Sequence, residues 1–219
     1  MWFMTLKSDL GSYRKSYSKN TIFEFKDFNN PLALFSQWFK DFDNDITDSE
    51  ANAMSLSTIS IDGFPKNRIV LLKEFNEDGF TFYTNYNSDK GLSISKNNKV
   101  CLSFFWEEHE RQVIIKGHAE KISDFKSKEY FKSRPRGSQL GAIVSDQSTV
   151  IDSKKKLVTR LYELENKYMN SSIPKPSHWG GYIVSPVEYE FWQGGENRLH
   201  DRARFLRENN SWTKERLSP

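Results

Sequence analysis

Apolar and polar residues alternate over several short stretches of the chain, and this period of two is typical of half-buried β-strands. The pattern predicts strands over residues 54–61, 68–75, 80–84, 100–106 and 112–122. Asp62-Gly63 and Asp78-Gly79 separate neighbouring stretches, and an Asp-Gly pair favours a tight hairpin turn. Near the C-terminus, further strands are predicted over residues 182–184, 189–192, 202–208 and 212–216.

Apolar residues recur at helical spacing before and between these strands. The clearest example starts at Pro31, which suits the first turn of a helix, and continues with Leu32, Phe35, Trp38, Phe39 and Phe42. Further helices are predicted from Ser88 and over residues 124–132, 138–144 and 153–168. The order of elements predicts a mainly β fold of the α+β class, an antiparallel barrel with peripheral helices. We expect residues 1–28 to form an arm and residues 29–219 to form a single domain.

The composition adds limits to this picture. Hydrophobic residues make up 37% of the 219 residues and aromatic residues reach 15%, so we expect a core built from Phe, Tyr and Trp. The net charge of +3 is compatible with small phosphorylated ligands and gives no argument for nucleic acid. The single cysteine, Cys101, excludes an internal disulfide and suits a reducing compartment. No stretch is long and apolar enough to span a membrane, and no signal peptide is recognisable, so we expect a cytoplasmic protein.

The chemically densest stretch reads Phe191-Trp-Gln-Gly-Gly-Glu-Asn-Arg-Leu-His-Asp-Arg202. If its last five residues are extended, Arg198, His200 and Arg202 lie on one face, because side chains alternate along a strand. Three nitrogen-rich groups on one face favour an anionic or electron-rich partner opposite them. The alternative is a solvated edge strand with surface charges.

Three other segments are candidate phosphate sites, each with a structural alternative. Arg68 and Lys73 bracket an apolar stretch and could hold phosphate from its two ends, or they could be ordinary cations at the ends of a strand. Ser88 is predicted to cap a helix whose first amides, together with Lys90, would bind an anion, although capping alone explains the serine equally well.

The third segment surrounds a predicted helix end. Tyr130 and Arg134 are four residues apart and would share a helical face, with Ser138 at the start of the next helix. A phenol, a guanidinium and a hydroxyl that converge there would suit a phosphate monoester. The alternative is a basic turn followed by a capping serine.

Several kinds of site are not indicated by the sequence. No glycine-rich nucleotide loop is present, the four histidines lack metal-ligand spacing, and no serine–histidine–acid arrangement is readable. The chain therefore offers anion sites and aromatic residues but little acid–base machinery. A cofactor that brings its own reactivity would fit this pattern.

Seven motifs occur together in order: Arg68-Ile-Val-Leu-Leu-Lys73, Phe82-Tyr-Thr-Asn85, Glu110-Arg-Gln-Val113, Tyr130-Phe-Lys-Ser-Arg-Pro135, Gln147-Ser148, Phe191-Trp-Gln-Gly-Gly195 and Arg198-Leu-His-Asp-Arg202. The ordered set, with the ending over residues 212–219, resembles the pyridoxamine 5′-phosphate oxidase family from about Tyr13 onward. The resemblance implies a split β-barrel that binds FMN at the interface of a homodimer. It also implies oxidation of pyridoxamine or pyridoxine 5′-phosphate to pyridoxal 5′-phosphate, a step of vitamin B6 metabolism in which O2 reoxidises the flavin and H2O2 forms.

The resemblance further implies roles for individual residues. The FMN site would comprise Arg68, Ile69, Val70, Leu71, Leu72, Lys73, Tyr83, Thr84, Lys90, Gln112, Gln147, Ser148, Trp192 and Arg202, with Arg68, Lys90 and Ser148 at the FMN phosphate. The substrate site would comprise Arg14, Lys15, Ser16, Tyr17, Lys73, Tyr130, Arg134, Ser138, Arg198, Leu199 and His200. Within it, Lys73, Tyr130, Arg134 and Ser138 would hold the substrate phosphate. Arg198 and His200 would be the catalytic pair over the pyridine ring, and no metal is implied.

One position departs from the family pattern. Many members have Arg-Lys before the helix at the FMN phosphate, whereas this chain has Asp89-Lys90. An acid there removes a cation and adds repulsion, so weaker FMN binding is expected.

Two other functions remain open: a split-barrel flavoprotein that acts on a different substrate, and a non-enzymatic dimer that binds pyridoxal phosphate.

Overall fold

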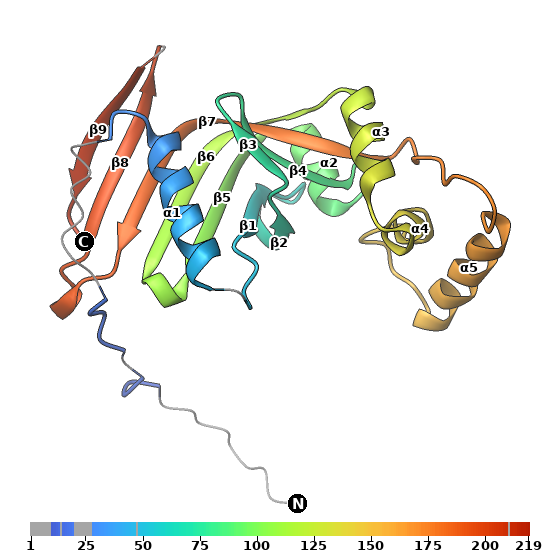
Figure 1. The fold of residues 1–219 in the computed structure, drawn as a ribbon, viewed down its shortest axis with the longest axis horizontal. Helices are drawn as coiled ribbons and strands as arrows, with labels where there is room; N and C mark the ends of the chain where they lie inside the picture. The colour runs from blue at the N-terminus through green and yellow to red at the C-terminus, as the bar shows by residue number, and fades with distance from the viewer. Residues whose placement is uncertain (1–9, 14, 20–27, 47, 210) are drawn as a thin grey trace, which may run out of the picture.

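The computed structural model describes residues 10–13, 15–19, 28–46, 48–209 and 211–219. Within these residues, nine antiparallel strands form one strongly curved sheet (Figure 1). Seven of them follow the order β2-β1-β5-β6-β7-β4-β3, and β8 pairs with β7 and carries β9 on its outer side. The strands are β1 (Ala53–Ile59), β2 (Pro65–Leu71), β3 (Glu74–Asn76), β4 (Gly79–Asn85), β5 (Lys99–Trp106), β6 (Arg111–Lys121), β7 (Trp179–Gln193), β8 (Asp201–Glu208) and β9 (Ser211–Leu217).

Both predicted Asp-Gly hairpin turns are confirmed. The first joins β1 to β2, which pair in register from Ala53 opposite Leu71 to Ile59 opposite Pro65. The second joins β3 to β4, where Gly79 has a φ of +141°. A Cβ atom at Gly79 would lie 2.1 Å from the carbonyl oxygen of Val184, so the close approach of β7 requires glycine there.

The prediction of one strand over residues 68–75 was wrong. Strand β2 ends at Leu71 and β3 begins only at Glu74, and between them Leu72 is buried in the core and bonds to Asn52, whereas the Lys73 amide donates to the Thr81 carbonyl in β4. The Leu72 amide donates to the Asn52 carbonyl at 2.8 Å, and Asn52 Nδ2 donates to the Leu72 carbonyl at 2.9 Å. Lys73 therefore does not share a strand face with Ile69 and Leu71.

Strand β7 is the longest element of the sheet. The sequence predicted two short strands here, at residues 182–184 and 189–192, whereas the structure has one strand from Trp179 to Gln193. One edge of β7 pairs with β6, and the other edge pairs with β4 in its first half and β8 in its second half. At about 3.3 Å per residue, its length along the chain is roughly 45 Å.

Helix α1 (Pro31–Asp45) covers one face of the sheet and fills the core with aromatic side chains, as the composition predicted. Asn30 caps it by accepting a hydrogen bond from the Leu32 amide at 2.8 Å. The fully buried Phe35 ring packs edge-on against the rings of Phe80 and Phe104, at centroid distances of 4.9 and 5.1 Å. These contacts fix the curvature of the sheet around the helix.

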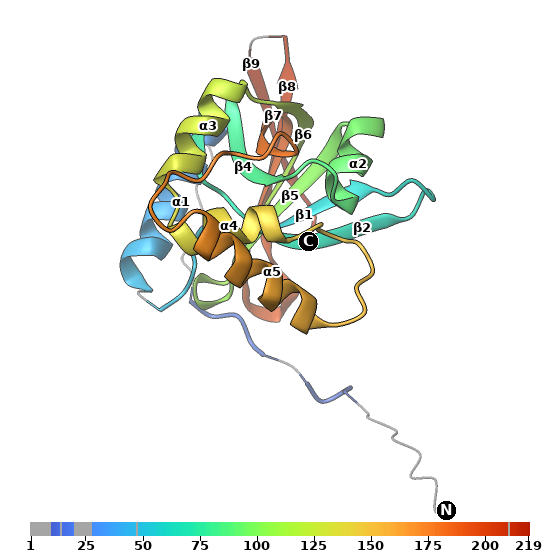
Figure 2. The same ribbon diagram turned by 90° about the vertical axis from the view of Figure 1, so that its right-hand side faces the viewer.

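A second, smaller core lies where β7 begins. Helices α3 (Asp124–Ser133), α4 (Arg136–Val144) and α5 (Lys154–Lys167) gather there, at the opposite end of the molecule from β8 and β9 (Figures 1 and 2). Its buried residues are Phe131, Leu140, Ile173 and Trp179. The remaining helix, α2 (Asp89–Lys96), follows β4. None of the described helices is both long and apolar enough to cross a membrane.

Candidate active site

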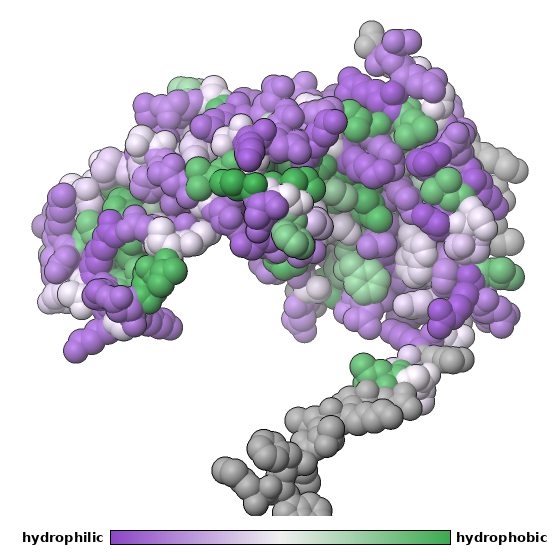
Figure 3. Space-filling model, turned by 180° about the vertical axis from the view of Figure 1, so that it is seen from behind, coloured by the Kyte–Doolittle hydropathy of each residue, from purple (hydrophilic) through white to green (hydrophobic). Residues whose placement is uncertain are grey.

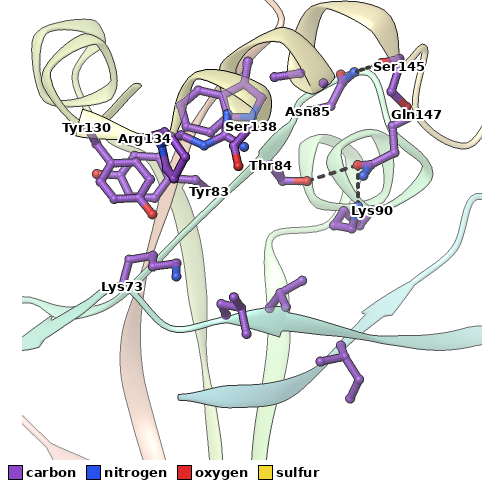
Figure 4. Close-up of a pocket in the computed structure, with 17 residues that line it drawn as sticks. Lys73, Tyr83, Thr84, Asn85, Lys90, Tyr130, Arg134, Ser138, Ser145 and Gln147 are labelled. Atoms are coloured by element: carbon purple, nitrogen blue, oxygen red, sulfur yellow. Dashed lines mark hydrogen bonds between the residues drawn. The ribbon is translucent and has the colours of Figure 1, made fainter. Parts of the chain in front are cut away.

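A cavity of about 560 Å³ lies between the end of β2, the end of β4 and helix α4. Seen from behind, the surface is hollowed between the helical lobe and the body of the sheet (Figure 3). The cavity brings together many of the residues predicted to bind FMN or substrate, and Figure 4 shows how they converge on it. These are Ile69, Val70, Leu71, Lys73, Tyr83, Thr84, Lys90, Tyr130, Arg134, Ser138 and Gln147.

One end of the cavity is formed by aromatic rings and a guanidinium. The rings of Tyr83 and Tyr130 stack with centroids 3.8 Å apart, and Arg134 Cζ lies 4.6 Å from the centre of the Trp179 ring. Arg134 Nη1 is buried and has no hydrogen-bond partner in the described part of the chain. Burial lowers the pKa of Arg134, although an arginine stays charged at any physiological pH. A half-buried guanidinium with a buried, unused donor is a natural place for an anion.

The helical reasoning for this end was wrong in two details. Helix α3 ends at Ser133, so Arg134 is its C-cap residue with an extended ψ of 149° and does not share a helical face with Tyr130. Helix α4 already begins at Arg136, so Ser138 lies inside its first turn and is not the cap. The side chains of Tyr130 and Arg134 lie together because both pack against the Trp179 ring.

The other end of the cavity lies at the start of α2. Ser88 is the N-cap, as predicted, and its Oγ accepts a hydrogen bond from the Gly91 amide at 3.4 Å. Lys90 is only 8% exposed, and its Nζ donates to Gln147 Oε1 at 2.7 Å and to Ser88 Oγ at 3.2 Å. Burial, and after it the charge of Arg68, lowers the pKa of Lys90 to about 8.

Arg68 lies beside this end and is held by three hydrogen bonds. Its Nη1 donates to Thr58 Oγ1 at 2.8 Å and to the carbonyls of Lys66 and Leu56 at 2.9 and 3.0 Å. Its Nη2 is buried without a hydrogen-bond partner among the residues that the structure describes. Burial lowers the pKa of this guanidinium as well. Arg68 and Lys90 thus form a second cationic site.

A neighbouring cavity of about 750 Å³ continues from this cationic site toward Ser148 and Asp89. Ser148 has a φ of +73°, a strained backbone for a residue other than glycine. The Asp89 carboxylate forms an ion pair with Lys66. The hydrogen bond from Lys66 holds the pKa of Asp89 below its usual value, and the charge of Arg68 acts in the same direction. The sequence had not indicated Lys66 as a partner of this acid.

A separate group of predicted site residues lies at the other end of β7. Strand pairing places Gln112 and Arg202 directly on either side of Trp192. The ring of His200 lies 4.8 Å from that of Trp192, and Tyr17 packs edge-on against Trp192 at 5.5 Å and against His200 at 5.8 Å. None of these five residues lines the cavity.

The histidine of this group has a defined hydrogen bond. The Gly195 amide donates to His200 Nδ1 at 3.1 Å, so in the neutral ring the proton is on Nε2. Burial, followed by the charge of Arg198, lowers the pKa of His200, and both favour the neutral form.

The conditional prediction that Arg198, His200 and Arg202 share an extended face was wrong. Arg198 belongs to a 3₁₀ turn, Glu196–Arg198, in which Asn197 and Arg198 have φ angles of +54° and +64°. The turn leaves Arg198 exposed, whereas Arg202 is tied to the sheet. Arg202 Nη2 donates to Glu190 Oε1 at 2.6 Å, and its Nη1 donates to the Ser218 carbonyl at 2.8 Å.

The remaining predicted site residues are not drawn together. Arg14 lies outside the described residues, Lys15 pairs with Glu107 at 3.5 Å, and Ser16 is exposed. Leu199 is exposed beside Arg198, and Leu72 points into the hydrophobic core and does not line the cavity. The sequence also gave no sign that Trp179 would line the cavity, although its His-Trp-Gly-Gly setting marked a turn.

Comparisons with known proteins bear on what this arrangement does. A family sequence model described as "Pyridoxamine 5'-phosphate oxidase" matches residues 46–167. A second, described as "Pyridoxine 5'-phosphate oxidase C-terminal dimerisation region", matches residues 179–219, which include β7, β8 and β9.

Full-length relatives and solved structures agree with these matches. The pyridoxine/pyridoxamine 5′-phosphate oxidase of Flavobacterium johnsoniae is 55% identical over 96% of this chain and 99% of its own length. The enzyme of the same name from Christiangramia forsetii is 51% identical over 98% of this chain and 100% of its own. Among solved structures, the fold matches PhzG from Burkholderia lata, which was solved with tetrahydrophenazine-1-carboxylic acid. The TM-score is 0.86 and the identity is 25%, over 94% of this chain and 100% of that one.

The fold also matches an FMN-binding, pyridoxamine 5′-phosphate oxidase-related protein from Nostoc punctiforme. Here the TM-score is 0.68 and the identity is 13%, over 91% of this chain and 99% of that one. The predicted split-barrel fold is therefore confirmed.

Proposed function

The chain belongs to the pyridoxamine 5′-phosphate oxidase family, and from that premise we propose that it oxidises pyridoxamine or pyridoxine 5′-phosphate to pyridoxal 5′-phosphate with FMN as its cofactor. In this proposal O2 accepts the electrons and H2O2 is the second product. One observation supports it most strongly. Two adjoining cavities, which share Ile69, Lys90 and Gln147 in their walls, each have a cationic site, and each site contains an arginine with a buried donor atom that has no hydrogen-bond partner among the described residues. Cofactor and substrate each carry one phosphate monoester.

The residues present fit FMN. Arg68 Nη2 has no acceptor in the described part of the chain, Lys90 adds a second cation, and the cap of α2 presents backbone amides, so this end suits the FMN phosphate. Ile69, Val70 and Leu71 line the space between the two ends with backbone and apolar side chains. Bound FMN would accept the electrons from the substrate carbon that bears the amine or alcohol.

The other end of the cavity suits the substrate phosphate. The substrate phosphate would be held by Arg134, Lys73, Tyr130 and Ser138. Holding the phosphate would fix the position of the reacting carbon of the substrate in the cavity. Arg198 would lie over the pyridine ring, where its charge stabilises electron density that develops as the substrate loses a proton. His200 would contact the pyridine ring of the substrate as a neutral imidazole with its proton on Nε2.

The active site would be shared by two copies of the chain. Trp192 lies thirteen residues beyond Trp179 along β7, which at about 3.3 Å per residue corresponds to roughly 43 Å of strand between Trp192 and the residue that lines the cavity. Gln112, Trp192, Arg198 and His200 therefore lie toward the far end of β7 from the cavity of their own chain, and none of them lines it. A homodimer that brings this group over the partner's cavity resolves the separation, and the dimerisation region matched over residues 179–219 supports it.

A single preparation separates this proposal from its two rivals. The purified protein is expected to be yellow with bound flavin and, on addition of pyridoxamine 5′-phosphate in air, to form pyridoxal 5′-phosphate and peroxide. Colour without turnover would favour a flavoprotein with another substrate. A colourless protein that binds pyridoxal 5′-phosphate tightly would favour the non-enzymatic dimer.

Asp89→Arg is expected to tighten FMN binding by about tenfold, or roughly 1.4 kcal/mol. The substitution removes the one carboxylate among the described residues that line the neighbouring cavity with Arg68 and Lys90, and it adds a cation. Lys66, freed from its ion pair with Asp89, would add to the positive potential. The FMN dissociation constant of each variant, measured by quenching of flavin fluorescence, tests this. Asp89→Asn is the matched control and should give an intermediate value; equal constants for wild type and Asp89→Arg contradict the prediction.

FMN affinity is expected to fall as the pH rises through about 8, because Lys90 has a pKa of about 8. A lysine is charged below its pKa and neutral above it, so the cation that the phosphate needs is lost on the alkaline side. One pH unit above the pKa, only about a tenth of the side chain is charged, so affinity should fall up to about tenfold. Titrations on both sides of this pH test it. Lys90→Met should bind FMN weakly at every pH and lack this step; a step of unchanged size in Lys90→Met would assign it to another group.

A further inference from the structure

Trp179, the first residue of β7, contacts the substrate-phosphate end of the cavity through the face of its ring. It is only 5% exposed. Its ring lies almost parallel to those of Tyr83 and Tyr130, with interplanar angles of 12° and 5° and centroid distances of 5.4 and 6.2 Å. On the same ring lies the guanidinium of Arg134, with Cζ 4.6 Å from the ring centre. One tryptophan thus contacts three cavity residues that come from β4, α3 and the end of α3.

We propose that Trp179 is a positioning residue that holds Arg134 and Tyr130 in the geometry that selects a phosphorylated substrate. This inference rests on the proposed function and deepens it, because it names what gives the site its preference for the phosphate. An arginine side chain has several rotatable bonds and loses rotamer entropy when it is fixed. A ring face that fixes the guanidinium plane before the ligand arrives removes that cost from binding.

Lys175 holds the backbone of Trp179 in place. The Lys175 side chain is only 5% exposed, and its Nζ donates to the Trp179 carbonyl at 2.8 Å and to the Pro176 carbonyl at 3.1 Å. The same Nζ lies 3.0 Å from Asp124 Oδ1, at the first turn of α3. One buried ammonium therefore ties the backbone of Trp179 to the helix that carries Tyr130 and leads into Arg134.

A purely structural role for Trp179 makes a different prediction. Trp179 also packs against Phe131 in the small core, at a ring distance of 5.2 Å, so its loss will lower stability in either case. If it served only the core, phosphorylated and unphosphorylated ligands would be affected alike. A positioning role affects only the ligand that carries the phosphate.

The test compares two ligands that differ only in the phosphate. 4-Deoxypyridoxine 5′-phosphate and 4-deoxypyridoxine lack the oxidisable group, so their binding to the FMN-loaded protein can be followed from the flavin spectrum without turnover. In Trp179→Leu, the phosphorylated ligand is expected to bind about tenfold to a hundredfold more weakly, with the affinity for the unphosphorylated ligand unchanged. Trp179→Phe keeps an aromatic face and should recover most of the loss. Lys175→Met should act in the same direction as Trp179→Leu with a smaller effect.

Trp38 provides a matched control elsewhere in the fold. It is 3% exposed and has the guanidinium of Arg111 at the same distance, 4.6 Å from its ring. Arg111 is paired with Asp41 at 3.1 Å and lies outside the cavity. Trp38→Leu should therefore lower the melting temperature and leave the affinities for both ligands unchanged.

The outcomes distinguish this inference from the function on which it rests. If Trp179→Leu binds the phosphorylated ligand as well as wild type does, or if Trp38→Leu weakens it equally, the positioning role is overturned while the proposed function stands. If the wild-type protein itself does not distinguish the two ligands, the substrate-phosphate site fails, and the positioning role fails with it.

Discussion

Arg198→Ala is expected to lower the turnover number by about two to three orders of magnitude and to leave FMN bound. The side chain is exposed on a turn that holds Asn197 and Arg198 at positive φ, so its removal opens no hole in the core. Such strained positions are typical of functional sites. In the proposed shared site Arg198 faces the substrate, whereas Arg68 and Lys90 of the other copy hold the FMN phosphate, so FMN anchoring should not depend on Arg198.

Steady-state kinetics with pyridoxamine 5′-phosphate and the flavin content of the purified variant measure the two effects separately. Arg207→Ala is a suitable control, because Arg207 lies toward the opposite end of β8 from the site group and packs near Trp212. It should retain full turnover. Activity of Arg198→Ala within a few fold of wild type would show that Arg198 is not catalytic.

A mixture of two inactive variants is expected to regain activity. Arg134→Met disables the cavity, and Arg198→Ala disables the group at the far end of β7. In a hybrid dimer with a shared site, one of the two sites combines the intact cavity of one copy with the intact Arg198 of the other. Random pairing makes about half of the dimers hybrid, so the mixture should reach about a quarter of the wild-type activity.

Co-expression with two different affinity tags yields the hybrid dimer directly, and each variant expressed alone is the control. If both groups served the site of their own chain, each site of the hybrid would carry one defect. Its activity would then stay at the level of the single variants. That result would contradict the shared site.

Local sequence signals predicted the features of this fold that depend on neighbouring residues. Asp-Gly turns, the Ser88 cap and the Pro31 helix start each rest on residues a few positions apart, and all three are confirmed. The strand over residues 68–75 was wrong because Leu72 bonds to Asn52 whereas Lys73 bonds to Thr81 in β4, so the chain changes its partner strand at this point.

The candidate site shows the same division between local and distant contacts. Arg134 and Tyr130 were expected to converge through helical spacing, yet they converge because Trp179, more than forty residues later, stacks on both. Spacing could not reveal that contact. The predicted common face of Arg198, His200 and Arg202 was wrong for a related reason. A turn, in which the Leu199 amide donates a hydrogen bond to the Glu196 carbonyl, takes the place of the expected strand. The roles assigned to individual residues by resemblance stay predictions until variants are measured.

The most direct measurement is a single turnover in the absence of O2. Pyridoxamine 5′-phosphate is added to the FMN-loaded protein under nitrogen, and the visible flavin absorbance and pyridoxal 5′-phosphate are followed together. The proposed function predicts that the flavin colour is lost and that the amount of pyridoxal 5′-phosphate formed equals the amount of FMN, with the colour restored when air is admitted. Persistent flavin colour with no pyridoxal 5′-phosphate formed would contradict it.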